Sequence, residues 1–246
     1  MRMYWALLLL FASATAQAAG LTVSAASSLT ESFREIAGAY EKAHPGTKVD
    51  LNFAASGVLL QQVARGAPVD VFASADQTTM DQAAEQGLLE PGSRQDFAAN
   101  SLWVVVPPAA RHKPATLAEL AKPGIERIAI GNPDSVPVGR YARGALQQAE
   151  LWQAVQGRVI STQNVRQSLD YVARGEVDAG FVYATDAQAM PGRVQRAFEV
   201  PVRGGIRYPI AQVKGSANAL QARQFVAFVR SPQGQAILRR HGFGSP

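Results

Sequence analysis

The sequence predicts an α/β fold of two lobes, each a mostly parallel sheet flanked by helices, with a ligand cleft between the lobes. Strand-like and helix-like segments alternate through almost the whole chain, a pattern typical of parallel sheets covered by helices on both faces. Two such sets follow one another, joined by apolar strands at 101–106 and 208–213. The 246 residues include no cysteine, so hydrophobic cores rather than disulfides must stabilise the fold.

The N-terminal segment has the features of a secretory signal peptide. Arg2 supplies the positive start, residues 6–12 form an apolar core, and residues 16–18 form a small-residue cleavage site. The apolar run is shorter than the ~20 residues that a membrane-spanning helix needs. We therefore expect residues 1–18 to be cleaved and the mature protein to be exported to the periplasm. Arg2 is the only charged residue removed, so the formal net charge falls from +5 to +4.

The first set of elements precedes residue 100. The expected strands are 21–23, 49–53 and 69–73, and the expected helices start near Ser28, at 58–65 and at about 77–86. The first helix has an apolar face with helical spacing, formed by Leu29, Phe33, Ile36, Ala37 and Tyr40. Its start fits a capping box, in which the side chains of Ser28 and Glu31 pair with each other's backbone N–H groups.

The second set repeats the alternation. The expected strands are 101–106, 127–130, 158–161, 178–183 and 208–213, and the expected helices are 138–149, 165–174, about 217–229 and 232–240. The strands at 101–106 and 208–213 are the predicted outward and return crossings between lobes. The predicted division is therefore lobe I at 19–101 plus 209–246, and lobe II at 102–208.

Four helix starts follow strands and are candidate ligand-binding positions, because ligands of open α/β sheets lie where strands end and helices begin. They are Ser27-Ser28, Ser56-Gly57, Pro137-Val138-Gly139 and Asn164-Val165. A helix start offers unpaired N–H groups and the positive end of the helix dipole, which together attract anions. Pro137 suits a first turn and leaves the N–H of Val138 exposed, and Asn164 is a good N-cap. Plain capping explains any one of these; the four together favour an oxyanion site.

A site built only from N–H and O–H donors distinguishes anions by their protonation. A fully deprotonated dianion accepts a hydrogen bond from every donor, whereas a hydrogen phosphate carries a proton that needs an acceptor. Leaving that group unpaired in a buried site costs about 1–3 kcal/mol or more. None of the four helix starts has an aspartate or glutamate at the candidate donor position. The pattern therefore disfavours phosphate.

Several longer motifs resemble the periplasmic molybdate-binding proteins of ABC importers. They are Ala-Ala-Ser-Ser-Leu-Thr at 25–30 and the segments at 53–57, 69–76, 131–142, 164–166, 181–186 and 208–210. The resemblance covers essentially the whole mature chain. It implies a two-lobed type II periplasmic binding protein that binds molybdate, and also tungstate, with high affinity and delivers it to membrane permease subunits. It further implies a monomer with no cofactor and no bare metal cation, since molybdenum is bound as its oxyanion.

The resemblance also implies five ligand-binding residues. The two serine hydroxyls fall on Ser28 and Ser56, the two backbone N–H groups on Val138 and Val165, and the tyrosine hydroxyl on Tyr183. The family often has alanine at the position of Val138, and some members have serine after the second binding serine, where this chain has glycine. Without the resemblance, a tyrosine that ends an apolar strand is more often a core residue with a local hydrogen bond.

Other functions remain as alternatives. A secreted hydrolase is disfavoured, because no Gly-x-Ser-x-Gly motif, metal-ligand spacing or nucleotide loop is present and the 3 histidines lie away from the motifs. Nucleic acid binding is also disfavoured, since the basic residues are scattered. The remaining alternative is a binding protein of the same architecture with another ligand, either another oxyanion such as sulfate or an organic acid. The carboxylate of an organic acid is usually bound by the two parallel N–H groups of an arginine fork. Arg140 and Arg166 are candidates for that fork; otherwise they are expected to be exposed.

Overall fold

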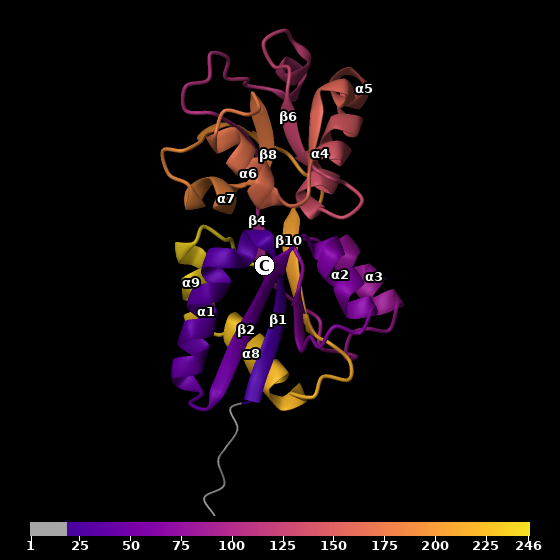
Figure 1. Ribbon diagram of the computed structural model, residues 1–246, viewed down its shortest axis with the longest axis vertical. Coiled ribbons are helices and arrows are strands. Elements are labelled where there is room, and N and C mark those ends of the chain that lie inside the picture. Colours follow the sequence, from indigo (N-terminus) through magenta and orange to yellow (C-terminus); the bar gives the residue numbers. More distant parts are fainter. Residues whose placement is uncertain (1–18) are drawn as a thin grey trace, which may run out of the picture.

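The computed structural model describes residues 19–246, so the predicted signal peptide at 1–18 lies outside the described residues. Figure 1 shows two lobes stacked along the long axis of the molecule, with the C-terminus close to their junction. Each lobe is built on one five-stranded sheet. None of the helices among residues 19–246 combines the length and the apolar character that crossing a bilayer requires.

The sheet of lobe I has the strand order β2-β1-β3-β10-β4. Its strands are β1 (Ala19–Ala26), β2 (Thr47–Ala54), β3 (Val71–Ala73), β4 (Gln95–Asn100) and β10 (Ile206–Gln212). The sheet of lobe II has the order β7-β6-β8-β5-β9. Its strands are β5 (Leu102–Val106), β6 (Ile128–Gly131), β7 (Val159–Thr162), β8 (Ala179–Tyr183) and β9 (Gln195–Val200). The chain passes between the sheets at Ser101 and again at residues 201–205.

One strand in each sheet runs opposite to the other four. β10 pairs antiparallel with both β3 and β4, and β5 pairs antiparallel with both β8 and β9. The pairs β1–β2, β1–β3, β6–β7 and β6–β8 are parallel. β5 and β10 are the strands that enter a lobe from the other one, so they run away from the junction. The remaining strands end at the junction, and the predicted mostly parallel sheets are confirmed.

Helices cover both faces of each sheet. Those of lobe I are α1 (Thr30–Ala43), α2 (Ser56–Ala64), α3 (Gln77–Glu85), α8 (Ala219–Arg230) and α9 (Pro232–Arg240). Those of lobe II are α4 (Pro137–Gln148), α5 (Trp152–Val155), α6 (Val165–Ala173) and α7 (Ala184–Ala189), and the short 3-10 turns are η1 (Ser27–Leu29), η2 (Leu117–Ala121) and η3 (Gln156–Arg158). α1, α8 and α9 pack through Phe33, Phe225 and Ile237 on one face of the lobe I sheet. On the other face α2 and α3 pack through Leu59 and Met80.

The sequence pattern does not predict two of the strands, and one predicted helix cap is wrong. β4 and β9 are edge strands, which carry too few apolar residues for a clear period. The capping box of Ser28 and Glu31 does not form, because Ser27–Leu29 is a 3-10 turn and α1 begins at Thr30 without a side-chain cap. The Ser28 hydroxyl instead contacts Tyr208, and Glu31 pairs with Arg166. Both predicted capping groups thus make long-range contacts.

Candidate functional site

Strand ends from both lobes converge on one small cavity. Lobe I contributes the residues after β1, β2 and β3, and lobe II those after β6 and β7 and at the end of β8. The lining residues are Ala26, Ser27, Ser28, Ala54, Ala55, Ser56, Ala75, Val136, Pro137, Val138, Val165 and Tyr183. All five residues singled out in the sequence lie among them. The cavity volume is about 10 Å³, on the scale of a site for one very small molecule or ion.

Lobe I presents two serine hydroxyls. Ser28 lies in the 3-10 turn after β1 and Ser56 is the first residue of α2, and both are buried. The Ser56 Oγ accepts a hydrogen bond from the N–H of Ala75 at 3.0 Å. Because that oxygen already accepts, the Ser56 hydroxyl is free to donate its own hydrogen. The Ser28 Oγ lies 3.0 Å from the hydroxyl oxygen of Tyr208.

Lobe II presents backbone N–H groups at two helix starts. Val138 is the second residue of α4, directly after Pro137, and Val165 is the first residue of α6. N–H groups in a first helical turn have no partner within the helix, and the helix dipole gives them a partial positive charge. Asn164 caps α6 by accepting a hydrogen bond from Gln167 N–H at 3.0 Å. The predicted Asn164 cap and the predicted first-turn position of Pro137 are confirmed.

Tyr183 also belongs to lobe II, at the end of β8, and its side chain is only 1% exposed. Its ring packs edge-on against Tyr208, while its hydroxyl reaches across to the carbonyl of Ala75 in lobe I at 3.5 Å. Burial raises the pKa of Tyr183 well above its ordinary value, so the hydroxyl keeps its hydrogen and can donate it. The tyrosine therefore has a core ring and a hydroxyl at the cavity.

The two lobes touch through backbone beside the cavity. Gly57 N–H, in α2, donates to the carbonyl of Ser135 in lobe II at 3.0 Å. A Cβ at position 57 would lie 2.7 Å from that carbonyl oxygen and 2.9 Å from the Ser135 Cα. Glycine is therefore the residue that fits this close approach of the lobes. Similarly, a Cβ at Gly139 would lie 1.8 Å from the carbonyl oxygen of Gly131, so α4 can start this close to β6 only with glycine there.

Arg140 of α4 reaches from lobe II into lobe I. Its Nε donates to Asp76 Oδ2 at 2.8 Å and its Nη2 donates to Thr79 Oγ1 at 2.6 Å. Asp76 is 2% exposed and caps α3 by accepting from Thr79 N–H. A third bond, from Arg140 Nη1 to the carbonyl of Pro133, stays within lobe II. The guanidinium is thus fully engaged by protein groups on both sides of the junction.

Arg166 of α6 makes a second crossing between the lobes. Its guanidinium pairs with both carboxylate oxygens of Glu31 in lobe I, one of them at 3.1 Å. Its Nε lies 3.0 Å from Asp186 Oδ1, an ion pair without hydrogen-bond alignment, and 3.3 Å from the carbonyl of Ser27. Burial raises the pKa of Asp186 to about 6, against the lowering effect of Arg166.

Neither expectation for the two arginines holds. The side chains of Arg140 and Arg166 are 23% and 19% exposed, so they are not free surface groups. Neither lines the cavity, so they do not form a fork for a carboxylate ligand. Sequence spacing places them correctly near the helix starts, but it does not show the acids that meet them from the other lobe. Among the described residues that line the cavity, none carries a formal charge.

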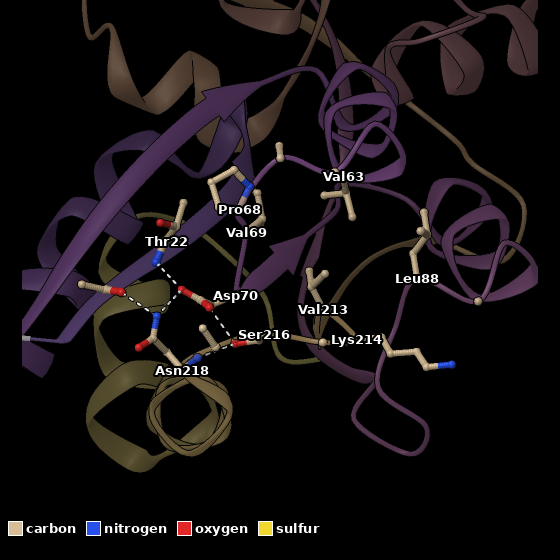
Figure 2. A pocket seen from close by; sticks show the side chains of 16 residues that line it. Thr22, Val63, Pro68, Val69, Asp70, Leu88, Val213, Lys214, Ser216 and Asn218 are labelled. Carbon is tan, nitrogen blue, oxygen red and sulfur yellow. Dashed lines mark hydrogen bonds between the residues drawn. The ribbon is translucent and has the colours of Figure 1, made fainter.

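A larger hollow lies at the far end of lobe I, near the start of β1 and β3. Figure 2 shows its lining around Asp70, and its volume is about 540 Å³. The Asp70 carboxylate accepts hydrogen bonds from Thr22 N–H at 2.8 Å, Ser216 Oγ at 2.6 Å and Asn218 Nδ2 at 3.2 Å. These bonds tie the segment before α8 to β1. The hollow lies at the wrong end of the strands for a ligand site of this fold.

Curated relatives and a family model match nearly the whole chain. The model described as bacterial extracellular solute-binding protein matches residues 21–244. Molybdate-binding protein ModA of Escherichia coli strain K12 is 36% identical over 238 residues, covering 94% of this chain and 91% of that protein. ModA of Mycobacterium tuberculosis strain H37Rv is 34% identical over 237 residues, covering 96% and 88%.

Solved structures share the fold. The Azotobacter vinelandii periplasmic molybdate-binding protein has a TM-score of 0.81 at 28% identity and covers 92% of this chain and 99% of that one. The sulfate-binding protein SubI of Mycobacterium tuberculosis H37Rv has a TM-score of 0.78 at 19% identity, covering 92% and 86%, a likeness of fold alone. Because the family model spans both sheets and every residue of the cavity, the chain belongs to the bacterial extracellular solute-binding protein family.

Proposed function

We propose that this protein binds molybdate, and also tungstate, as fully deprotonated oxyanions in the cavity between its lobes. The observation that carries the proposal is the lining of that cavity: neutral O–H and N–H donors from helix starts of both lobes, with no charged side chain among the described lining residues. Such donors hold an anion through partial charges in a dry site. The relatives named as molybdate-binding proteins match the chain over more than nine-tenths of its length.

We assign the ligand contacts to the hydroxyls of Ser28, Ser56 and Tyr183 and to the N–H groups of Val138 and Val165. Three of these are side-chain hydroxyls held in place by neighbours: Ser28 contacts the Tyr208 hydroxyl, Ser56 accepts from the Ala75 N–H, and Tyr183 donates to the Ala75 carbonyl at 3.5 Å, a long bond that it would exchange for one to the ion. The cavity volume of about 10 Å³ is close to the minimum for one water molecule, so this arrangement of the lobes has no space for an organic acid. The engagement of both nearby arginines also argues against a carboxylate ligand.

The proposed role is transport rather than catalysis. An anion held by donors from two lobes stabilises the closed arrangement, which membrane permease subunits of an ABC importer can then recognise. We propose that the protein is exported, acts as a monomer, and needs neither a cofactor nor a bare metal cation. A hydrolase and a sulfate-binding protein are the competing functions; an esterase screen with a generic ester tests the first, and the titration below tests the second.

Calorimetric titration of the mature protein with molybdate, tungstate, sulfate and phosphate tests the proposal directly. We expect tight binding of molybdate and tungstate, and weak binding of sulfate and phosphate. Molybdate at ~100 times its dissociation constant should add about 2.7 kcal/mol to the free energy of unfolding. Equal thermal shifts from all four salts would indicate generic ion stabilisation and contradict the proposal, and tight sulfate binding alone would support the sulfate alternative.

A further inference from the structure

Tyr208 lies directly behind the cavity, outside its lining. It belongs to β10, the strand by which the chain returns to lobe I, and its side chain is fully buried. Its hydroxyl oxygen lies 3.0 Å from the Ser28 Oγ, although the two residues are 180 positions apart. The distance alone leaves open which hydroxyl donates. The answer determines whether Ser28 offers a hydrogen or a lone pair to a bound ion.

Asn100, at the end of β4, settles the direction. Its Oδ1 accepts from the Ser101 N–H at 2.9 Å, and a backbone N–H can only donate, so the amide orientation is fixed. The Nδ2 group therefore donates to the Tyr208 hydroxyl at 3.3 Å and to Thr185 Oγ1 at 3.0 Å. With its oxygen accepting from Asn100, the Tyr208 hydroxyl has its own hydrogen to place, and the acceptor beside it is Ser28 Oγ.

Burial keeps that hydrogen on the phenol. Burial, assisted by the nearby Asp186 carboxylate, raises the pKa of Tyr208 well above its ordinary value, so the hydroxyl stays protonated. A buried O–H without an acceptor would cost about 1–3 kcal/mol, which favours the arrangement in which Tyr208 donates to Ser28. The chain of donation then runs from Asn100 to Tyr208 to Ser28, and the remaining hydrogen of Ser28 is free for the cavity.

We propose that Tyr208 is a positioning residue that fixes the Ser28 hydroxyl as a donor to the bound oxyanion and thereby excludes protonated anions. This rests on the proposed function of the cavity. Ser56 has the same arrangement, since the Ala75 N–H occupies its acceptor side. The difference is that the Ala75 N–H can be removed only by proline, which also restricts the backbone, whereas the Tyr208 hydroxyl can be removed without changing the backbone.

The selectivity consequence follows from the freedom that Ser28 gains without Tyr208. In Tyr208→Phe the Ser28 oxygen loses its donor, and the hydroxyl can rotate to present a lone pair to the cavity. A lone pair there can accept the proton of hydrogen phosphate, which the wild-type arrangement leaves unpaired. Sulfate is similar in shape but carries no proton at neutral pH, so the ratio of phosphate affinity to sulfate affinity isolates this effect.

The test compares Tyr208→Phe with wild type and with Tyr40→Phe. Tyr40 is equally buried in lobe I, but its hydroxyl donates to the Gln221 carbonyl at 3.3 Å, away from the cavity. Molybdate affinity is measured by calorimetry at neutral pH, and phosphate and sulfate affinities by competition against molybdate. We expect Tyr208→Phe to weaken molybdate binding about tenfold and to raise the phosphate-to-sulfate ratio about fivefold or more. Tyr40→Phe should change neither quantity.

The possible results separate the two proposals. If wild type fails to bind molybdate, the proposed function is wrong. If wild type binds and Tyr208→Phe weakens all three anions by the same factor, Tyr208 only supports the fold and the inference is overturned. Thermal unfolding checks that the variant is folded. Asn100→Ala provides a second variant: the Tyr208 hydroxyl can still donate to Ser28 without the Asn100 amide, so the ratio should stay near the wild-type value.

Discussion

The two lobes share one topology but supply the cavity with different kinds of donor. In both sheets the central parallel strands end at the junction and one reversed strand enters from the other lobe. Lobe I then offers serine hydroxyls, at Ser28 and Ser56, whereas lobe II offers the backbone N–H groups of Val138 and Val165 together with one side-chain hydroxyl, that of Tyr183. A side-chain donor can be deleted without moving the chain, but a backbone donor is lost only when its helix moves or when proline replaces the residue.

The local sequence explains this difference. In lobe I the helical segments after β1 and β2 open with Ser27 and Ser56, so the hydroxyls of Ser28 and Ser56 can donate to a ligand, whereas α3 after β3 opens with Gln77. In lobe II, α4 opens with Pro137 and α6 follows the cap Asn164. Proline offers no N–H, and the Asn164 side chain is used by its own helix. The next donors along each helix are backbone N–H groups. The same topology therefore lines the lobe II side of the cavity with backbone donors.

Displacing a helix of lobe II should therefore have the largest effect on binding. In Gly139→Ala the new Cβ would meet the carbonyl of Gly131 at 1.8 Å, so the start of α4 must move and carry the Val138 N–H with it. We expect molybdate affinity to fall roughly 100-fold or more and stability to fall by about 1–3 kcal/mol. Calorimetry and denaturant unfolding measure the two effects.

Gly144→Ala is the matched control on the same helix. A Cβ at position 144 has nothing within 4 Å, so helix propensity alone acts there and should stabilise the protein by up to about 1 kcal/mol. Molybdate affinity should stay at the wild-type value. If Gly139→Ala binds as well as Gly144→Ala, the start of α4 does not hold the ligand, and the contrast between the lobes would have to be abandoned.

The fold and the convergence of the cavity residues could be predicted from sequence, because both depend on local pattern. Alternation of strands and helices indicates parallel sheets, and in such sheets the strand ends meet at one edge. Asn164 and Pro137 are local signals of helix starts and were interpreted correctly. The same rule selects the helix starts that contain Ser28, Ser56, Val138 and Val165, whereas Tyr183 is selected by the family resemblance alone; all five line one cavity, and their role as ligands stays a prediction.

The remaining features depend on contacts that no local pattern contains. Arg140 meets Asp76 and Arg166 meets Glu31 only because the two lobes face each other. Likewise the Ser28 hydroxyl contacts Tyr208, from a distant strand, and does not form the predicted helix cap. Tyr208 falls within a motif that the resemblance uses, at 208–210. A buried tyrosine next to a lobe crossing is the one sequence signal that could have suggested its role.

Removing a serine hydroxyl from lobe I should have the second-largest effect. Ser28→Ala and Ser56→Ala each delete a donor to a charged acceptor, worth about 1.5–3 kcal/mol, so molybdate affinity should fall roughly ten- to a hundredfold. The fold should survive, because neither serine caps a helix through its side chain. Ser27→Ala tests the register in calorimetric titrations and should cause a smaller loss. A critical Ser27 with a dispensable Ser28 would show that the assigned serine is wrong by one position.

The Tyr183 hydroxyl should contribute less than either serine, because its present partner, the Ala75 carbonyl, lies at 3.5 Å. Tyr183→Phe keeps the buried ring and removes only the donor. We expect about a tenfold loss of molybdate affinity with little change in ligand-free stability. Small-angle scattering should show that compaction then needs more molybdate. Normal binding combined with easier unfolding would instead identify Tyr183 as a core residue with a local hydrogen bond.

Removing an ion pair that crosses between the lobes should have the smallest effect on molybdate affinity, because these side chains contact each other and do not line the cavity. Arg140→Gln removes the ion pair with Asp76 but keeps an amide that can still reach Thr79. We expect the dissociation constant for molybdate to rise about two- to fivefold, and the difference to change little with salt, because Asp76 is buried and a buried pair is screened much less than a surface one.

Arg143→Gln is the control for that variant, since Arg143 lies on the same helix but is exposed and stacks over Trp152 within lobe II. Calorimetry at low and high salt compares the two variants. Arg140 lies two residues beyond Val138 and binds Asp76, which follows Ala75. It therefore connects the part of lobe II that lines the cavity to the part of lobe I that lines it. If Arg140→Gln lowers the free energy of unfolding without ligand as much as it lowers the free energy of binding, the arginine stabilises the fold in general and not the closed arrangement of the lobes. If it lowers affinity alone, the Arg140–Asp76 ion pair stabilises the closed arrangement of the lobes without contacting the ligand.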